Sequence, residues 1–232
     1  MVLLLILARK TKIKKMKRTI QFITILAVFT FFIGCDNQPG TKTNDPEIEK
    51  ADESACIYSV VKDSTSINWT AFKTNDRVGV KGHFDVFKVW LPKDVKSPTE
   101  ALVGTAFDVG TKSVNTGNAE RDPKLVKFFF DTLTDGHIIK GEIVSADGNE
   151  NEGNGLIKLM FNGVTKEIVY TYKIMNNKIY LKTGINIGEW DGSAAVESLN
   201  TECYDLHTGE DGVSKLWPDI EIEVIAELKK QC

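Results

Sequence analysis

The side chains that could do chemistry in this chain of 232 residues are its four cysteines, its three histidines and its carboxylates. His83, His137 and His207 lie on separate segments, whereas a metal site needs several converging ligands. His83 and Asp85 share one face of an expected strand, and such a pair more often marks a solvated face. The chain contains no G-x-S-x-G, no H-E-x-x-H and no phosphate-binding glycine loop. We therefore expect no catalytic residue, no metal and no cofactor, and a protein that is not an enzyme.

The start of the chain has the form of a bacterial lipoprotein leader. Basic residues between positions 14 and 18 precede an apolar run over 20–32, which is the order of a secretory signal peptide. Phe32-Ile33-Gly34-Cys35 then resembles a lipobox, in which the cysteine is acylated. We expect residues 1–34 to be a lipoprotein signal peptide, with Met16 as the true start. An uncleaved membrane anchor is the alternative, because the apolar run is borderline in length.

The charge distribution along the chain indicates which classes of binding partner are unfavourable. Residues 1–34 hold seven of the 29 basic residues and no acidic ones, so the remainder has 22 basic and 32 acidic residues, a formal charge of −10. An acidic chain argues against a nucleic-acid partner and against electrostatic binding to anionic membranes. Membrane attachment would come from acyl chains on Cys35. We expect a location in the cell envelope, either on the periplasmic side of a membrane or on the outer-membrane surface.

The remaining residues divide into a tether and one domain. Residues 35–55 comprise the lipidated Cys35 and a polar, charged stretch over 36–55, which predicts a disordered tether. Residues 56–232 are enough for one domain with a core. Apolar residues alternate there in short segments, over 56–61, 67–71, 78–84, 103–109, 139–143, 157–161, 168–174, 179–187 and 220–226. With tight turns between them, such as Asn176-Asn177, these segments predict an antiparallel sandwich or barrel of about eight strands. Glycines in 78–84 suggest a sharp bend.

Two stretches follow a helical pattern instead. Asp122-Pro123 combines a capping acceptor with the residue favoured at the first helical position, which predicts a short helix near 123–130. Leu125, Phe128 and Phe129 share one face of it, and we expect them to close or line an apolar barrel. A longer amphipathic helix is predicted near 193–206, with Cys203 on its apolar stripe.

Three motifs in the right order carry a family resemblance. Val80-Lys81-Gly82-His83-Phe84 is similar to a V-x-G-x-F strand. The others are Ser113-Val114-Asn115-Thr116-Gly117 with Arg121-Asp122 and Phe129-Phe130-Asp131, and Leu159-x-Phe161 with Gly163-Val164-Thr165-Lys166. Together they resemble the YceI-like family over about Tyr58 to Leu228. The helix near 193–206 and the loop after it are longer than the basic family pattern.

The resemblance implies an all-β fold with minor α, an antiparallel lipocalin-like eight-stranded β-barrel. It also implies a binding protein whose relatives hold a polyisoprenoid chain, such as a quinone or polyprenyl lipid, and it allows a homodimer. An eight-stranded barrel has room for one slender ligand. The alternative is a structural or protein-interaction envelope lipoprotein with no bound ligand, and an enzyme on the same barrel ranks third.

Large apolar residues at inward positions are the candidates for lining such a channel. Inward residues also fill any barrel, so core packing competes with ligand contact at each of them. The candidate channel residues are Trp69, Phe84, Phe107, Phe128, Phe129, Leu159, Phe161 and Tyr170.

Three cysteines and one arginine complete the set of candidates. In a closed antiparallel barrel the first and last strands pair, which would bring Cys56 and Cys232 to one end, and we expect them to form a disulfide. Cys203 would then be a buried free thiol, and a Cys203–Cys232 bond is the alternative. Arg121 could pair with a carboxylate or with a ligand headgroup, and we favour the carboxylate.

Overall fold

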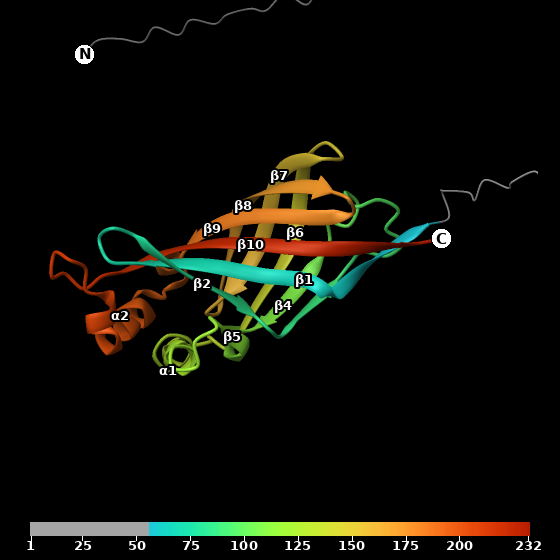
Figure 1. Ribbon diagram of the computed structural model, residues 1–232. Coiled ribbons are helices and arrows are strands. Elements are labelled where there is room, and N and C mark those ends of the chain that lie inside the picture. The colour runs from blue at the N-terminus through green and yellow to red at the C-terminus, as the bar shows by residue number, and fades with distance from the viewer. Residues whose placement is uncertain (1–55) are drawn as a thin grey trace, which may run out of the picture. The chain divides into compact units, whose positions relative to one another are not determined.

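The computed structural model describes residues 56–232, and the expected signal peptide, Cys35 and the tether lie outside these residues (Figure 1). The described part of the chain forms one ten-stranded antiparallel sheet in the order β3-β4-β6-β7-β8-β9-β10-β1-β2-β5. The strands are β1 (Ile57–Lys73), β2 (Val78–Phe84), β3 (Phe87–Trp90), β4 (Ala106–Gly110), β5 (Val114–Asn115), β6 (Ile138–Gly148), β7 (Glu152–Phe161), β8 (Val164–Met175), β9 (Lys178–Asn186) and β10 (Leu216–Gln231).

The two edges of this sheet meet, so the sheet curls on itself. β3 lies at one end of the strand order and β2 with β5 at the other, yet only two residues separate β2 from β3. Across the junction, the Asp85 N–H donates to the Ser113 carbonyl at 3.1 Å and the Gly110 N–H donates to the Val86 carbonyl at 2.9 Å. The expected fold class, an antiparallel lipocalin-like β-fold with few helices, is confirmed.

The expected strands map well onto the eight longer strands. The first two expected segments form the single strand β1, whose register with β10 shifts between Val61 and Ser66. The short strands β3 and β5 were not predicted. Asn176 and Asn177 make the expected tight turn between β8 and β9, both with positive φ angles of 53° and 59°.

A disulfide bond joins the two longest strands at one end of the domain. It links Cys56 to Cys232, directly outside the Ile57–Gln231 pair of β1 and β10. This is the first of the two pairings considered from the sequence, and Cys203 is a buried free thiol. Residues 56–232 hold a ten-stranded sheet, a hydrophobic core and a disulfide, so this segment contains what an independently folding domain needs.

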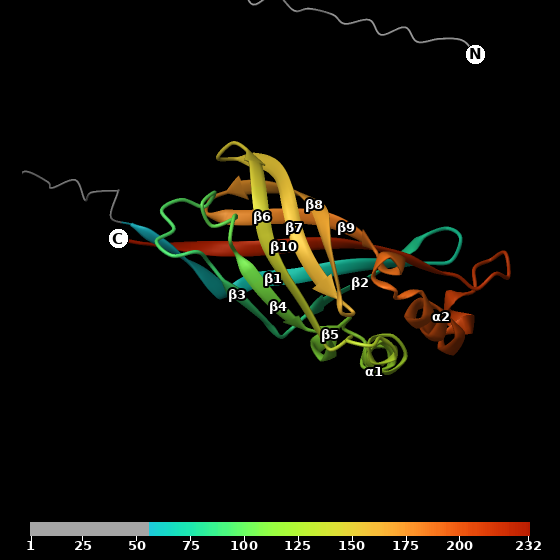
Figure 2. The ribbon, with the colours of Figure 1, turned by 180° about the vertical axis from the view of Figure 1, so that it is seen from behind.

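The helices lie at the opposite end from the disulfide, as both ribbon views show (Figures 1 and 2). They are α1 (Asp122–Phe128), α2 (Ser193–Glu202) and α3 (Tyr204–His207). The helix expected near 193–206 is therefore broken at Cys203. Within residues 56–232, no helix has the length and apolar character needed to span a membrane.

The start of α1 differs from the prediction in one detail. Asn118, and not Asp122, caps the turn that leads into the helix, because its Oδ1 accepts from the Glu120 and Arg121 N–H groups at 3.0 Å. The Asp122 carboxylate instead accepts from the Thr116 N–H at 3.0 Å and from the Thr116 hydroxyl at 2.6 Å. These bonds fix α1 against the loop that precedes it.

Glycines on the inner wall make room for aromatic rings on neighbouring strands. Gly82 of β2 faces Trp69 of β1, and Gly141 of β6 faces Phe107 of β4, both in register. A Cβ atom at Gly82 would lie 2.3 Å from the indole, and one at Gly141 would lie 2.2 Å from the phenyl ring. Close packing of a cross-strand ring therefore explains the glycines at positions 82 and 141.

Candidate functional site

An apolar cavity of about 450 Å³ lies inside the curled sheet. This volume falls within the range of small-molecule sites, roughly 300–1,000 Å³. Its lining follows β1 from Val60 to Lys73 and β10 from Leu216 to Leu228, so the cavity runs along most of both strands. Further apolar walls come from the other strands, including Val109, Ile139, Ile143, Ile157, Ile168, Ile179 and Leu181.

Six of the eight residues expected to line a channel do line this cavity. They come from four strands and from the segment that follows α1, and they surround one common space: Trp69, Phe84, Phe107, Phe129, Leu159 and Phe161. Leu125, which was placed on the same helix face as Phe129, lines it as well. The structure thus brings together residues that are up to about 90 positions apart in the chain.

Phe128 does not line the cavity, contrary to the prediction. It is half-buried on the outside of α1, where it borders a shallow depression with Ala194 and Glu197 of α2. The Lys127 ammonium lies over its ring at 4.8 Å. The short helix ends at Phe128, and Leu125 and Phe129, four residues apart, are the side chains that reach the interior.

Tyr170 is also not part of the cavity lining and belongs to the solid core. Its side chain is 1% exposed, and its hydroxyl donates to the Ser145 carbonyl at 2.9 Å. The ring lies against Gly155, its cross-strand neighbour on β7. Burial, with a smaller effect of Tyr172, raises the Tyr170 pKa to about 12, so the hydroxyl keeps its proton. Alternation along β8 correctly predicted that Tyr170 faces the interior, but side chains fill the interior around Tyr170.

Polar side chains line the cavity mainly at its helix end, and most of them were not predicted. They come from β1, from α1 and the loop before it, and from α2 and α3: Lys73, Asn118, Glu120, Arg121, Lys124, Cys203 and His207. Only Arg121 had been considered from the sequence as a ligand contact. No local pattern could have identified the rest, because four separate parts of the chain contribute them.

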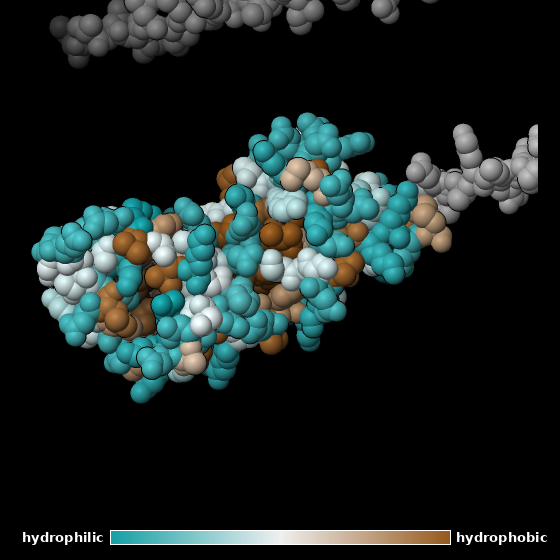
Figure 3. Space-filling model, in the orientation of Figure 1, coloured by the Kyte–Doolittle hydropathy of each residue, from teal (hydrophilic) through white to brown (hydrophobic). Residues whose placement is uncertain are grey.

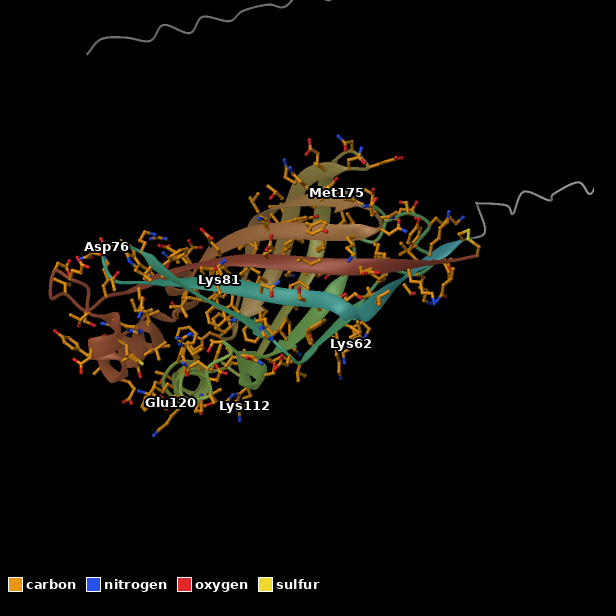
Figure 4. All side chains as sticks on the ribbon, viewed as in Figure 1. Lys62, Asp76, Lys81, Lys112, Glu120 and Met175 are labelled. Atoms are coloured by element: carbon orange, nitrogen blue, oxygen red, sulfur yellow. A yellow bond between two sulfur atoms is a disulfide. The ribbon has the colours of Figure 1, made fainter. Side chains whose placement is uncertain are left out.

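The view with side chains shows Glu120 beside α1 and Asp76 near the tip of the β1–β2 hairpin, both at the end of the domain that carries α2 (Figure 4). The space-filling view shows hydrophobic residues enclosed by hydrophilic ones at the same end (Figure 3). Apolar interior and polar border therefore meet there.

Hydrogen bonds and burial fix the electrostatics of this end. The Lys73 ammonium donates to the Leu206 carbonyl at 2.6 Å, and the Lys124 ammonium lies 3.7 Å from a Glu202 carboxylate oxygen. Burial, and then the charge of Lys73, lowers the His207 pKa to about 4, so His207 is neutral at pH 7. Burial raises the pKa of the Cys203 thiol, because it disfavours the charged thiolate, and the positive charge of Lys124 lowers this pKa by a smaller amount.

No group of three or more His, Cys, Asp or Glu residues converges on a metal-binding arrangement within residues 56–232. The His83 ring lies 3.0 Å from the Asp85 carboxylate, and both side chains are about half exposed. This pair also meets the Asn115 side chain, which donates to Asp85 at 3.0 Å. It forms a solvated contact between β2 and β5.

A curled antiparallel sheet around a long apolar cavity defines the lipocalin-like class of binding folds. Comparison with known families narrows this class. The YceI-like domain matches residues 58–228, and the chain belongs to this family. Among curated proteins, none matches the chain.

Solved structures agree with this assignment at the level of the fold. A polyisoprenoid-binding domain from Saccharophagus degradans, implicated in plant cell wall breakdown, is 16% identical with a TM-score of 0.54, covering 74% of this chain and 96% of that one. A mutant of the Campylobacter jejuni YceI protein is 19% identical with a TM-score of 0.50, covering 67% of this chain and 86% of that one. At these identities the likeness concerns the fold.

Proposed function

We propose that this protein is a lipid-anchored protein of the cell envelope that holds one apolar chain, of the polyisoprenoid class, inside its barrel. The observation that carries the proposal is the shape of the cavity. Its lining on β1 runs from Val60 to Lys73, 13 residue steps, which at ~3.3 Å per step corresponds to at most about 43 Å of strand. A long, narrow, apolar space suits an extended chain better than a compact molecule.

The energetics favour the same class of ligand. Burial of each methylene group from water contributes about 0.8 kcal/mol, and the cavity walls offer few polar atoms that would need a partner. Immobilising a flexible chain opposes binding, and methyl branches with double bonds reduce that cost because they restrict rotation. The binding of a polyisoprenoid by the Saccharophagus degradans domain, which shares the fold, supports this choice of ligand.

The membrane attachment in this proposal rests on the sequence. The lipobox-like segment ending at Cys35 and the polar residues 36–55 support an acylated protein with a tether to its domain. Intact-mass analysis of the protein purified from membranes tests this part. We expect a chain that begins at Cys35 and carries acyl groups, whereas an unmodified Cys35 or a retained leader would contradict it.

Lipids that copurify with residues 56–232 test the binding function. We expect organic extracts of the purified domain, examined by mass spectrometry, to contain an isoprenoid chain in near-equal amount to the protein. Ala226→Phe places a ring in the cavity lining and should abolish copurification. Glu221→Phe on the exposed side of the same strand is the matched control and should retain it. Empty extracts, together with no shift of the melting temperature on adding farnesol or farnesyl phosphate, would refute the proposal.

A further inference from the structure

The charged side chains of the cavity lining all lie at its helix end. They are Lys73, Glu120, Arg121 and Lys124, three cations and one carboxylate. We call Lys73, Arg121 and Lys124 the cationic rim. All three line the same cavity: Lys73 comes from β1, and Arg121 and Lys124 come from the start of α1, where Lys124 lies 3.7 Å from Glu202 of α2.

This local excess of positive charge runs against the charge of the domain. Residues 1–34 contain seven basic residues, and residues 35–55 contain two basic and six acidic ones. The domain, residues 56–232, therefore has 20 basic and 26 acidic residues. Random placement would therefore favour a carboxylate at the cavity, yet the rim carries a surplus of cations.

Two of the three cations have no carboxylate partner. Within residues 56–232, neither Lys73 nor Arg121 forms an ion pair, and Lys124 has only the long contact of 3.7 Å to Glu202. Lys73 donates one bond to the Leu206 carbonyl, which is neutral, so two of its donor positions remain. The expected carboxylate partner of Arg121 is thus not observed. Positive charge beside an apolar interior attracts an anion more strongly than it would in bulk water.

We propose that the cationic rim is the headgroup site of the cavity and selects a chain that ends in a phosphate-type anion over one with a neutral end. This inference rests on the proposed function, because it assigns the direction of the bound chain. The anionic end contacts Lys73, Arg121 and Lys124, and the apolar chain extends along β1 and β10 towards the disulfide end. The planar guanidinium of Arg121 can donate two parallel bonds to phosphate oxygens.

The neutral polar groups at the helix end of the cavity do not oppose the binding of an anion there. His207 is uncharged at pH 7, and its Nδ1 is engaged with Asn200 Oδ1 at 2.9 Å. Asn118 uses its side-chain oxygen to cap the turn before α1, which leaves its amide free to donate. An alcohol or carbonyl end would gain single neutral hydrogen bonds here, whereas a phosphate would gain several charge-assisted ones.

Calorimetric titration of residues 56–232, stripped of lipid, with three probes at pH 7 tests the inference. Farnesyl phosphate and farnesol share one chain and differ in charge, and inorganic phosphate has the charge without the chain. We expect farnesyl phosphate to bind at least about 10-fold more tightly than farnesol, and inorganic phosphate to show no binding at millimolar concentration. In the wild type, farnesyl phosphate should also slow alkylation of Cys203, the free thiol at the rim.

Variants assign the selectivity to the rim. Arg121→Gln and Lys124→Met should each weaken farnesyl phosphate about 3- to 10-fold and weaken farnesol much less, because an alcohol end loses only neutral hydrogen bonds. Lys127→Met, on the outer side of the same helix, is the matched control and should alter neither. Arg121 is exposed and forms no ion pair within residues 56–232, so its replacement does not threaten folding.

The outcomes separate the inference from the function on which it rests. Equal affinities of farnesol and farnesyl phosphate would overturn the headgroup site and leave chain binding intact. Binding of inorganic phosphate as tight as that of farnesyl phosphate would also overturn it, because the site would then recognise a free anion. If neither chain bound, the proposed function itself would fail.

Discussion

Replacing Gly141 with alanine tests whether the inner wall needs glycine under an aromatic ring. The new Cβ would lie 2.2 Å from the tip of the Phe107 ring, and ordinary contact begins at 3.4 Å, so the ring must move by at least 1.2 Å. Phe107 lines the cavity, and the movement away from β6 takes the ring into that space. Overpacking of this kind typically costs about 1–3 kcal/mol of the free energy of unfolding.

Gly184 on β9 provides the matched control. A Cβ there meets only the Ile220 carbonyl oxygen at 3.7 Å, an ordinary contact, and its φ is not in the left-handed region. Gly184→Ala should therefore stabilise the domain, by about 0.5 kcal/mol, because the unfolded chain loses freedom. The two substitutions are the same chemically and are expected to have opposite signs.

Urea denaturation of both variants, followed by circular dichroism, measures the two free energies. Adding Phe107→Leu to Gly141→Ala should recover at least about 1 kcal/mol relative to the sum of the single changes, since the shorter side chain removes the clash. Affinity for farnesyl phosphate should fall in Gly141→Ala alone. If Gly141→Ala were as stable as Gly184→Ala, the ring would not depend on the glycine and our account of the wall would be wrong.

Three further predictions concern stability. Replacing Cys56 and Cys232 by serine should lower the free energy of unfolding by up to about 5 kcal/mol in the chain-entropy model, because the bond closes a loop of 176 residues; an equal urea midpoint with and without reductant would contradict this. His207 titrates near 4 when folded and near 6.5 when unfolded, so the unfolded chain binds more protons in between. Stability should therefore fall by about 2 kcal/mol as the pH drops from 6.5 to 4, and His207→Gln should flatten this slope in urea titrations. Tyr170→Phe removes the bond to the Ser145 carbonyl and should cost about 1 kcal/mol, with the melting temperature as readout and no change in ligand affinity.

Strand alternation is a local signal and was sufficient to predict an antiparallel sandwich or barrel, whereas the choice of a lipocalin-like barrel came from the family resemblance. The inward residues of β7 and β10, such as Leu159 and Val224, follow period two without interruption, and each such strand can be placed without its neighbours. β3 and β5 were not predicted because they are four and two residues long, and alternation over so few residues is not distinctive. Their existence depends on the junction of the sheet edges, which is a tertiary feature.

The candidate site was predictable only in part, for a related reason. Alternation shows that Tyr170 and Leu159 both face inward, but it does not show whether the space in front of each is filled. Tyr170 lies in the solid core, whereas Leu159 faces the cavity. Phe128 and Phe129 differ by one position on a helix of less than two full turns, so small differences in how the helix ends decide which ring enters the interior.

The rim and the wall illustrate why a cavity is harder to predict than a core. Lys73 and Lys124 line the same cavity only because the whole sheet places β1 and α1, and the residues near either lysine in the sequence do not predict the other. The wall is different. Trp69 and Phe107 each pack against a glycine of the next strand, which keeps two large rings close to the backbone and leaves the middle of the barrel open. The same rings packed over larger residues would be pushed inward and would reduce the space for a ligand. A sequence that pairs inward aromatic residues with inward glycines on the neighbouring strand therefore indicates a β-barrel with an open interior.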